Sequence, residues 1–197
     1  MQDKKIVKSV KSVIKFIFEF LEPVVFSFSI FAVIYIFIAQ PFEVKGASME
    51  PQLHDKEYIL TEKVSTRFGS FKRGDIVIFR FPYNREIDYI KRIIGLPGET
   101  ISVLDGKVYV NDKVLNEPYL RDITDIYPDP DNVLQEGKSI TVPQNYYFVL
   151  GDNRPHSQDS RYFGPVARSL LIGKAVIRYW PITNISLVDH PDYGLGF

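Results

Sequence analysis

The sequence contains no cysteine, one tryptophan, three histidines and no excess of either charge. Without cysteine the chain can form no disulfide and has no thiol nucleophile, and cysteine usage does not indicate a redox compartment. Lysine plus arginine and aspartate plus glutamate number 24 each, so no net field favours nucleic acid as a partner. Any catalytic role therefore falls to hydroxyl, amine, imidazole or carboxyl groups.

A long run without charge covers Pro23–Gln40, and five lysines precede it within residues 1–15. At about 1.5 Å per residue, a helix through this run spans roughly 27 Å, which crosses the hydrocarbon core of a bilayer. The lysines predict a cytoplasmic N-terminus. We therefore predict a single-pass protein of the plasma (inner) membrane, with a basic cytoplasmic segment at 1–22, a transmembrane anchor at 23–40 and an extracytoplasmic domain at 41–197.

A cleavable signal sequence is the alternative explanation of this run. Cleavage after Ala39 would put Phe37 where a small residue is required, with Pro41 close behind the bond. An uncleaved anchor fits better. The apolar stretch Phe16–Glu22 would extend the helix toward the cytoplasmic surface, although Pro23 is expected to kink or interrupt it.

Beyond the anchor, apolar residues recur with the period of β-strands, which predicts a mainly-β fold. Asp105-Gly106 lies between two such runs and predicts a hairpin with a type I′ turn. The Pro- and Asp-rich stretch 121–138 predicts a surface loop and lacks the spacing of a calcium loop. The strand-like runs lie at 58–64, 75–81, 87–94, 100–104, 107–110, 145–150 and 173–180.

The stretch that directly follows the anchor contains a candidate nucleophile, Ser48, between Gly46 and Pro51. Glycine allows close approach of another molecule, and proline fixes the turn after the serine. A serine acts as a nucleophile only when a base takes its proton. An ordinary turn serine is the alternative.

Two residues are candidates for the base that takes the proton of Ser48. His156 lies in a polar cluster with Asp152 and Asp159, which permits a Ser-His-Asp arrangement. Lys91 lies in the apolar strand-like run 87–94, where loss of hydration would lower its pKa from about 10.4 and let it accept a proton. On composition alone, a solvent-facing position of Lys91 on its strand is favoured over a catalytic one.

Four segments, in order after the anchor and over roughly residues 20–180, resemble the type I signal peptidases, which are membrane-anchored Ser-Lys endopeptidases. Each segment alone is weak, but their order after an anchor makes the resemblance specific. Gly46–Pro51 is similar to the family's nucleophile segment, and Arg73–Val77 is similar to the strand before the base. Tyr89–Gly98 is similar to the segment that carries the base, and Gly151–Arg154 with Ser157–Arg161 is similar to the family's final motif.

The resemblance implies Ser48 as the nucleophile and Lys91 as the general base. It implies that Ser157 orients the lysine by a hydrogen bond, and that a structural polar network beside the site includes Asp152, Asp159 and Arg161. The backbone N–H of Ser48 would hold the oxyanion with a second donor. Some members carry a serine two residues before the nucleophile as that donor, whereas this chain has Gly46 there.

The resemblance also implies a folded, barrel-like catalytic β-sheet and a reduced second β subdomain, at about 99–145. The implied reaction removes signal peptides from exported precursors after small residues at the first and third positions before the cut. From closeness in sequence to the catalytic pair, we expect pocket residues at Phe42, Val44, Met49 and Ile90. We expect no metal, no organic cofactor and no nucleic acid; the expected partners are the precursors and the bilayer, close to the export translocase.

Two other functions fit parts of the sequence. A Ser-Lys protease with one dedicated substrate would share the catalytic residues, but a self-cleaving repressor would need a DNA-binding domain, which no segment resembles. A catalytically inactive, membrane-tethered β module that binds export partners would be expected to have lost Ser48 or Lys91, and both are present.

Overall fold

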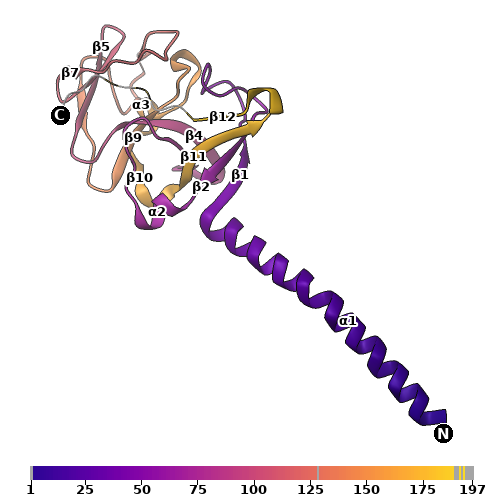
Figure 1. The fold of residues 1–197 in the computed structure, drawn as a ribbon. Helices are drawn as coiled ribbons and strands as arrows, with labels where there is room; N and C mark the ends of the chain where they lie inside the picture. Colours follow the sequence, from indigo (N-terminus) through magenta and orange to yellow (C-terminus); the bar gives the residue numbers. More distant parts are fainter. Residues whose placement is uncertain (1, 128, 189–190, 192, 194–197) are drawn as a thin grey trace. The chain divides into compact units, whose positions relative to one another are not determined.

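The computed structural model describes residues 2–127, 129–188, 191 and 193. The chain divides into two units, Met1–Ala39 and Gln40–Phe197. The first consists of the helix α1 (Gln2–Val33), which continues as a short π-helix η1 (Ile34–Ile38), as Figure 1 shows. The second is built mainly of antiparallel strands.

The helix of the first unit carries an apolar stretch, Ile14–Ile38, of 25 residues with a mean hydropathy of 2.2, enough by length and composition to cross a membrane. Pro23 lies inside α1, so the predicted interruption at this residue is wrong, and Phe16–Glu22 belongs to the same helix. A proline inside a helix removes one backbone hydrogen bond and clashes with the carbonyl four residues before it, so α1 continues through Pro23 at a local cost. The apolar run ends where the strand β1 (Ala39–Glu43) begins.

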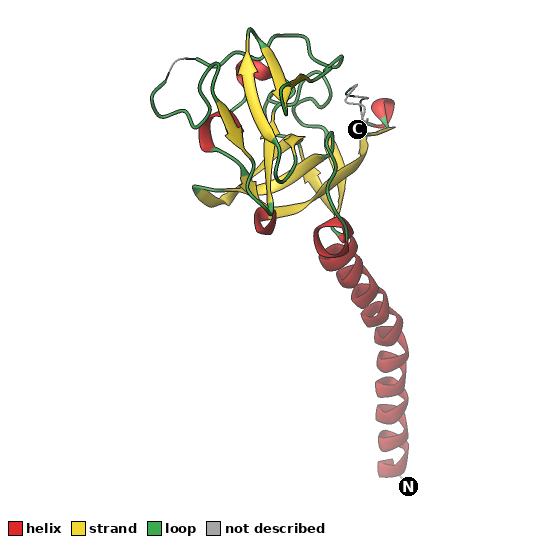
Figure 2. Ribbon diagram, turned by 90° about the vertical axis from the view of Figure 1, so that its left-hand side faces the viewer, coloured by secondary structure: helices red, strands yellow, loops and turns green. Residues whose placement is uncertain are grey.

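The larger sheet of the second unit contains eight strands in the order β1-β2-β11-β3-β4-β9-β10, with β12 paired to β11. Figure 2 shows this sheet curving around the lower part of the domain. The short helices α2 (Val64–Phe68), α3 (Ser160–Phe163), η2 (Arg154–His156), η3 (Arg168–Leu170) and η4 (Ile182–Asn184) connect its strands. The strands after β1 are β2 (Tyr58–Glu62), β3 (Ile76–Phe81), β4 (Asn84–Gly95), β9 (Tyr146–Leu150), β10 (Val166–Ala167), β11 (Leu171–Trp180) and β12 (Ser186–Leu187).

A smaller four-stranded sheet lies within the region predicted to form a second subdomain, in the order β7-β6-β5-β8. Its strands are β5 (Thr100–Leu104), β6 (Lys107–Val110), β7 (Lys113–Val114) and β8 (Ser139–Thr141). Asp105 and Gly106 join β5 to β6 with φ angles of 49° and 73°. Two positive φ angles are those of a type I′ turn, so the predicted hairpin is confirmed.

The stretch predicted as a surface loop, 121–138, contains neither helix nor strand in its described residues, 121–127 and 129–138. Its apolar residues Ile126 and Leu134 are nevertheless buried in the core between the two sheets. The loop is therefore fastened to the domain at two points, which the weak periodicity of its sequence did not predict.

Three apolar clusters hold the second unit together. One joins the two sheets through Phe148 and Leu150 of the larger sheet and Ile101 and Val108 of the smaller one. A second lies around Phe79 and the strands β4 and β9. The third packs the segment after β1 against β2, β3 and β11. The mainly-β fold with one N-terminal apolar helix confirms the predicted fold class.

Removing the Phe148 side chain should destabilise the domain strongly. Phe148 is fully buried between the sheets, and large-to-small substitutions at such sites cost about 3–5 kcal/mol. Urea unfolding of Phe148→Ala, followed by the fluorescence of Trp180, the single tryptophan, measures the free energy of unfolding. Tyr146→Ala on the same strand, where 39% of the residue is exposed, should cost less than about 1 kcal/mol; equal losses would contradict this core.

Candidate active site

Ser48 lies on a tight turn between β1 and β2, and buried residues on both sides hold this turn. Val44 and Met49 are 2% and 0% exposed and pack in the apolar cluster under the turn. Glu50 N donates to Ala47 O at 3.1 Å and closes the turn over Ser48. The half-buried serine is therefore presented on a rigid support.

Gly46 begins this turn with a φ of 83°, a conformation that glycine adopts without strain. Its N–H donates to Asp55 Oδ1 at 2.7 Å. That amide is already engaged, and glycine has no side chain to donate. Gly46 therefore shapes the turn and supplies no second donor beside Ser48.

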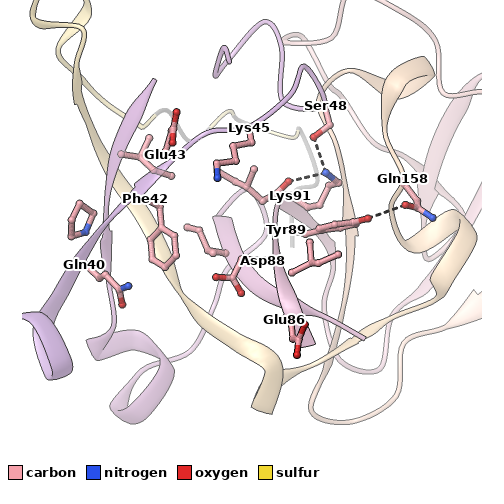
Figure 3. A pocket seen from close by; sticks show the side chains of 15 residues that line it. Gln40, Phe42, Glu43, Lys45, Ser48, Glu86, Asp88, Tyr89, Lys91 and Gln158 are labelled. Atoms are coloured by element: carbon pink, nitrogen blue, oxygen red, sulfur yellow. Dashed lines mark hydrogen bonds between the residues drawn. The ribbon is translucent and has the colours of Figure 1, made fainter. Parts of the chain in front are cut away.

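Lys91 lies on β4 opposite Val77 of β3 and is 4% exposed. Its Nζ lies 2.8 Å from Ser48 Oγ and donates to Ile90 O at 2.9 Å (Figure 3). The face of the Tyr89 ring lies 5.3 Å from the same nitrogen. The structure thus brings the two predicted catalytic side chains together, across 43 residues of sequence.

Burial lowers the pKa of Lys91 from 10.5 to about 8, because the charged amine loses its hydration. The charges of Asp159 and Asp152 act in the opposite direction, and Arg161 lowers the pKa further. At pH 7 a pKa near 8 leaves about one amine in ten neutral, against roughly one in three thousand for an ordinary lysine. The site therefore holds a usable base at neutral pH.

Ser157, predicted to hydrogen-bond this amine, is buried near the pair, but its Oγ has no hydrogen-bond partner among the described residues. The Lys91 amine donates instead to Ile90 O. Gly151 separates Ser157 from the nucleophile turn: a Cβ built there would lie 2.2 Å from Ser157 Oγ and 2.5 Å from Ser48 O. The predicted contact is thus replaced by close packing around a glycine.

The residues predicted to form a polar network beside the site are buried and belong to two ion pairs. Asp159 binds Arg161 through Nε and Nη2, each at 2.9 Å, and accepts from Gly151 N at 3.1 Å. Asp152 binds Arg92 through Nε at 2.8 Å and Nη2 at 2.6 Å. Sequence reasoning missed Arg92, although strand alternation places it on the face opposite Lys91.

A third buried pair joins Arg154 to Glu117, and sequence reasoning missed both residues. Arg154 also donates to Thr124 Oγ1 and, at 3.0 Å, to Gly151 O. Burial alone would lower the pKa of Arg154, but the charge and hydrogen bond of Glu117 hold it above the usual value. Glu117 comes from an irregular segment after β7 and had no motif that could have identified it.

The alternative base, His156, does not take part in a triad. Asp152 and Asp159, the acids that would have oriented it, are bound by Arg92 and Arg161. His156 itself lies in η2 and is exposed. The Ser-His-Asp arrangement is therefore wrong for this chain.

A groove of about 680 Å³ opens beside the Ser48–Lys91 pair, between β1 and β4. Phe42 and Ile90 line it as expected. Val44 and Met49 are not among the residues that line this groove, because both are buried in the apolar cluster under the nucleophile turn. Sequence reasoning did not name the other lining residues, although some adjoin the predicted ones in the sequence. They are Gln40, Pro41, Glu43, Lys45, Ile59, Ile78, Glu86, Ile87, Asp88, Tyr89 and Gln158.

Replacing Asp152 by asparagine should destabilise the domain by about 3 kcal/mol, because the Arg92 guanidinium would stay buried without a counter-charge. Urea unfolding reported by Trp180 measures this loss. The same change at the exposed Asp122 should alter the free energy of unfolding by less than about 0.5 kcal/mol. Equal stability of the two variants would show that the Arg92–Asp152 pair is dispensable.

Comparisons with known proteins identify the family of the chain. Residues 17–180 match the family described as signal peptidase, peptidase S26. The chain is 34% identical to signal peptidase IB of Staphylococcus aureus (strain COL) over 187 residues, which cover 90% of this chain and 97% of that protein.

Two further relatives belong to other bacteria. Over 157 residues the chain is 40% identical to a probable signal peptidase I-2 of Synechocystis, covering 77% of this chain and 68% of that one. A crystal structure of a signal peptidase I from Enterococcus faecalis V583 is 37% identical, with a TM-score of 0.42, and covers 53% of this chain and 96% of its own. The family match and the identities over most of the chain show that this protein belongs to the signal peptidase family, peptidase S26, whose members are serine endopeptidases.

Proposed function

We propose that this protein removes N-terminal signal peptides from exported precursors, with Ser48 as the nucleophile and Lys91 as the general base. The single observation that carries the proposal is the 2.8 Å separation between a buried amine and a hydroxyl at the end of a groove. Signal peptidase IB of S. aureus, similar along nearly the whole chain, supports the choice of substrate.

The contacts of the Lys91 amine suit a neutral base. A neutral amine has two N–H donors and one lone pair, and donation to Ile90 O turns the nitrogen so that the lone pair can face Ser48 Oγ. Ser48 would pass its proton to Lys91 as Oγ bonds to the substrate carbonyl carbon. Lys91 would then protonate the leaving amine, and it would next activate the water that hydrolyses the acyl-enzyme.

The negative charge of each tetrahedral intermediate needs a donor. Among the described residues none accepts a hydrogen bond from Ser48 N–H, so this amide is available to the oxyanion. No side chain at position 46 adds to it, as in the branch of the family with glycine there.

The groove suits a peptide in extended conformation. β9 pairs with β4 only from Arg92 to Gly95, whereas β3 pairs with β4 from Asn84 to Arg92, so Ile87–Ile90 have a strand on one side only in the described pairings. An extended substrate could add along this edge and place its first and third residues before the cut on the same face. Phe42 and Ile90 line the groove beside this edge, where they would limit the room for the substrate side chains.

The N-terminal helix supports action on precursors at a membrane. Its apolar stretch ends at Ile38, and only residues 39–47 separate it from Ser48, a tether of at most about 36 Å when fully extended. With the lysine-rich N-terminus in the cytoplasm, the catalytic domain would meet precursors as they leave the export translocase. A protease with one dedicated substrate would use the same dyad, and a panel of unrelated precursors separates the two possibilities.

Loss of either dyad residue should abolish processing of a precursor by the full-length protein in detergent. Ser48→Ala removes the nucleophile, and Lys91→Ala removes the base, so each should lower the rate at least about 10³-fold. Lys91→Arg should fail equally, because a guanidinium keeps its proton near neutral pH. The exposed residues Ser139 and Lys107 supply matched controls, Ser139→Ala and Lys107→Ala, which should cleave normally. Cleavage by Lys91→Arg would exclude the mechanism.

The rate should rise with pH through the pKa of Lys91. Since the neutral amine is the active form and burial lowers its pKa to about 8, kcat/KM should increase about tenfold per pH unit below pH 8 and level off above it. Peptide cleavage measured between pH 6 and pH 10 checks the midpoint. A rate that still rises about tenfold per pH unit between pH 9 and pH 10 would mean that the active lysine is solvated.

A further inference from the structure

Asn153 lies far from Ser48 in the sequence but makes two hydrogen bonds to the turn that carries it. Its backbone N–H donates to Ser48 O at 3.0 Å. Its side-chain Nδ2 donates to Ala47 O, also at 3.0 Å and across 106 residues. One residue thus holds two consecutive carbonyls of the nucleophile turn.

The bond to Ala47 O acts on the amide that would stabilise the oxyanion. Ala47 C=O and Ser48 N–H belong to one peptide group, which is planar and trans, so the two bonds point in opposite directions. Fixing the carbonyl therefore fixes the direction of the N–H. Glu50 N also donates to Ala47 O, at 3.1 Å, so the carbonyl is held from two sides.

Asn153 is itself held by its neighbours in sequence. Asp152 is bound by Arg92, and Arg154 is bound by Glu117 and donates to Gly151 O. Each of these pairs is buried, so the segment has little freedom to shift. A Cβ on Gly151 would lie 2.5 Å from Ser48 O, which shows how closely this segment presses on the turn.

We propose that Asn153 is a positioning residue for the oxyanion hole: its side-chain amide sets the orientation of the Ser48 N–H. The inference rests on the proposed function. During acylation Ser48 Oγ bonds to the substrate carbonyl carbon, the C=O π pair moves onto oxygen, and the Ser48 proton moves to Lys91. Ser48 N–H must point at that oxygen, and Asn153 holds it there before the substrate binds.

Asn153→Ala tests this role in the full-length protein in detergent, with a peptide substrate. Donors to a developing oxyanion act in the transition state more than in the bound substrate, so kcat should fall about 10- to 100-fold while KM changes less than about threefold. The pH midpoint near 8 should not move, because the base is untouched. Asn153→Asp, similar in shape but unable to donate, should lose at least as much kcat.

Asn132 provides the matched control. It is 7% exposed, and its Nδ2 donates to Tyr127 O at 2.7 Å in a loop that does not line the catalytic groove. Asn132→Ala removes the same kind of bond and should reduce thermal stability without lowering kcat. The thermal unfolding midpoints of the two alanine variants show whether a lower kcat comes from a less stable fold or from a misoriented Ser48 N–H.

The outcomes distinguish the two proposals. No processing by the wild type, with the protein folded, would reject signal peptide cleavage itself. Normal cleavage by the wild type with an unchanged kcat in Asn153→Ala would overturn only the role of Asn153. A kcat loss that Asn132→Ala shares in proportion to its lost stability, or a shift of the pH midpoint in Asn153→Ala, would also overturn it.

Discussion

The site depends on keeping one amine out of water. Lys91 is 4% exposed, burial brings its pKa to about 8, and its nitrogen lies 2.8 Å from Ser48 Oγ. In the proposed mechanism this nitrogen accepts the proton of that hydroxyl. Water is kept from the Lys91 amine only if the sheet is packed beneath and around it. The strands β3 and β4, the core under Met49 and the segment after β9 all serve this requirement, and the groove leaves open only the side from which a peptide can enter.

The domain also buries three arginine side chains, and it pairs each of them with a carboxylate. Arg92, Arg154 and Arg161 are each about 1% exposed or less in their side chains, and each binds a carboxylate. Removing one partner would leave a buried charge and cost several kcal/mol, whereas an intact buried pair adds little net stability. These pairs therefore mainly fix the geometry of the segment. They immobilise residues 151–161, the segment from which Gly151 and Asn153 reach the nucleophile turn.

Period-2 alternation and turn chemistry predicted seven strands and the Asp105-Gly106 hairpin, because those patterns reflect local preference and burial. The Ser48 and Lys91 positions followed from motifs. Closeness in sequence to the dyad does not separate Phe42 and Ile90, which line the groove, from Val44 and Met49, which are buried under the nucleophile turn, because burial is decided by tertiary packing. Glu117 and Asn153 act through contacts 37 and 106 residues away, and such pairings arise only from the tertiary fold.

The separation of these contacts along the chain has a consequence for the newly made protein. Ser48 and Lys91 emerge first, and the segment that closes around them, 151–161, comes from the last quarter of the sequence. Without that segment Lys91 would be more hydrated, and its pKa would lie closer to that of an ordinary lysine. Under the proposed mechanism an incompletely synthesised chain would therefore carry Ser48 without an effective base, and peptide cleavage would begin only when the tertiary structure is complete.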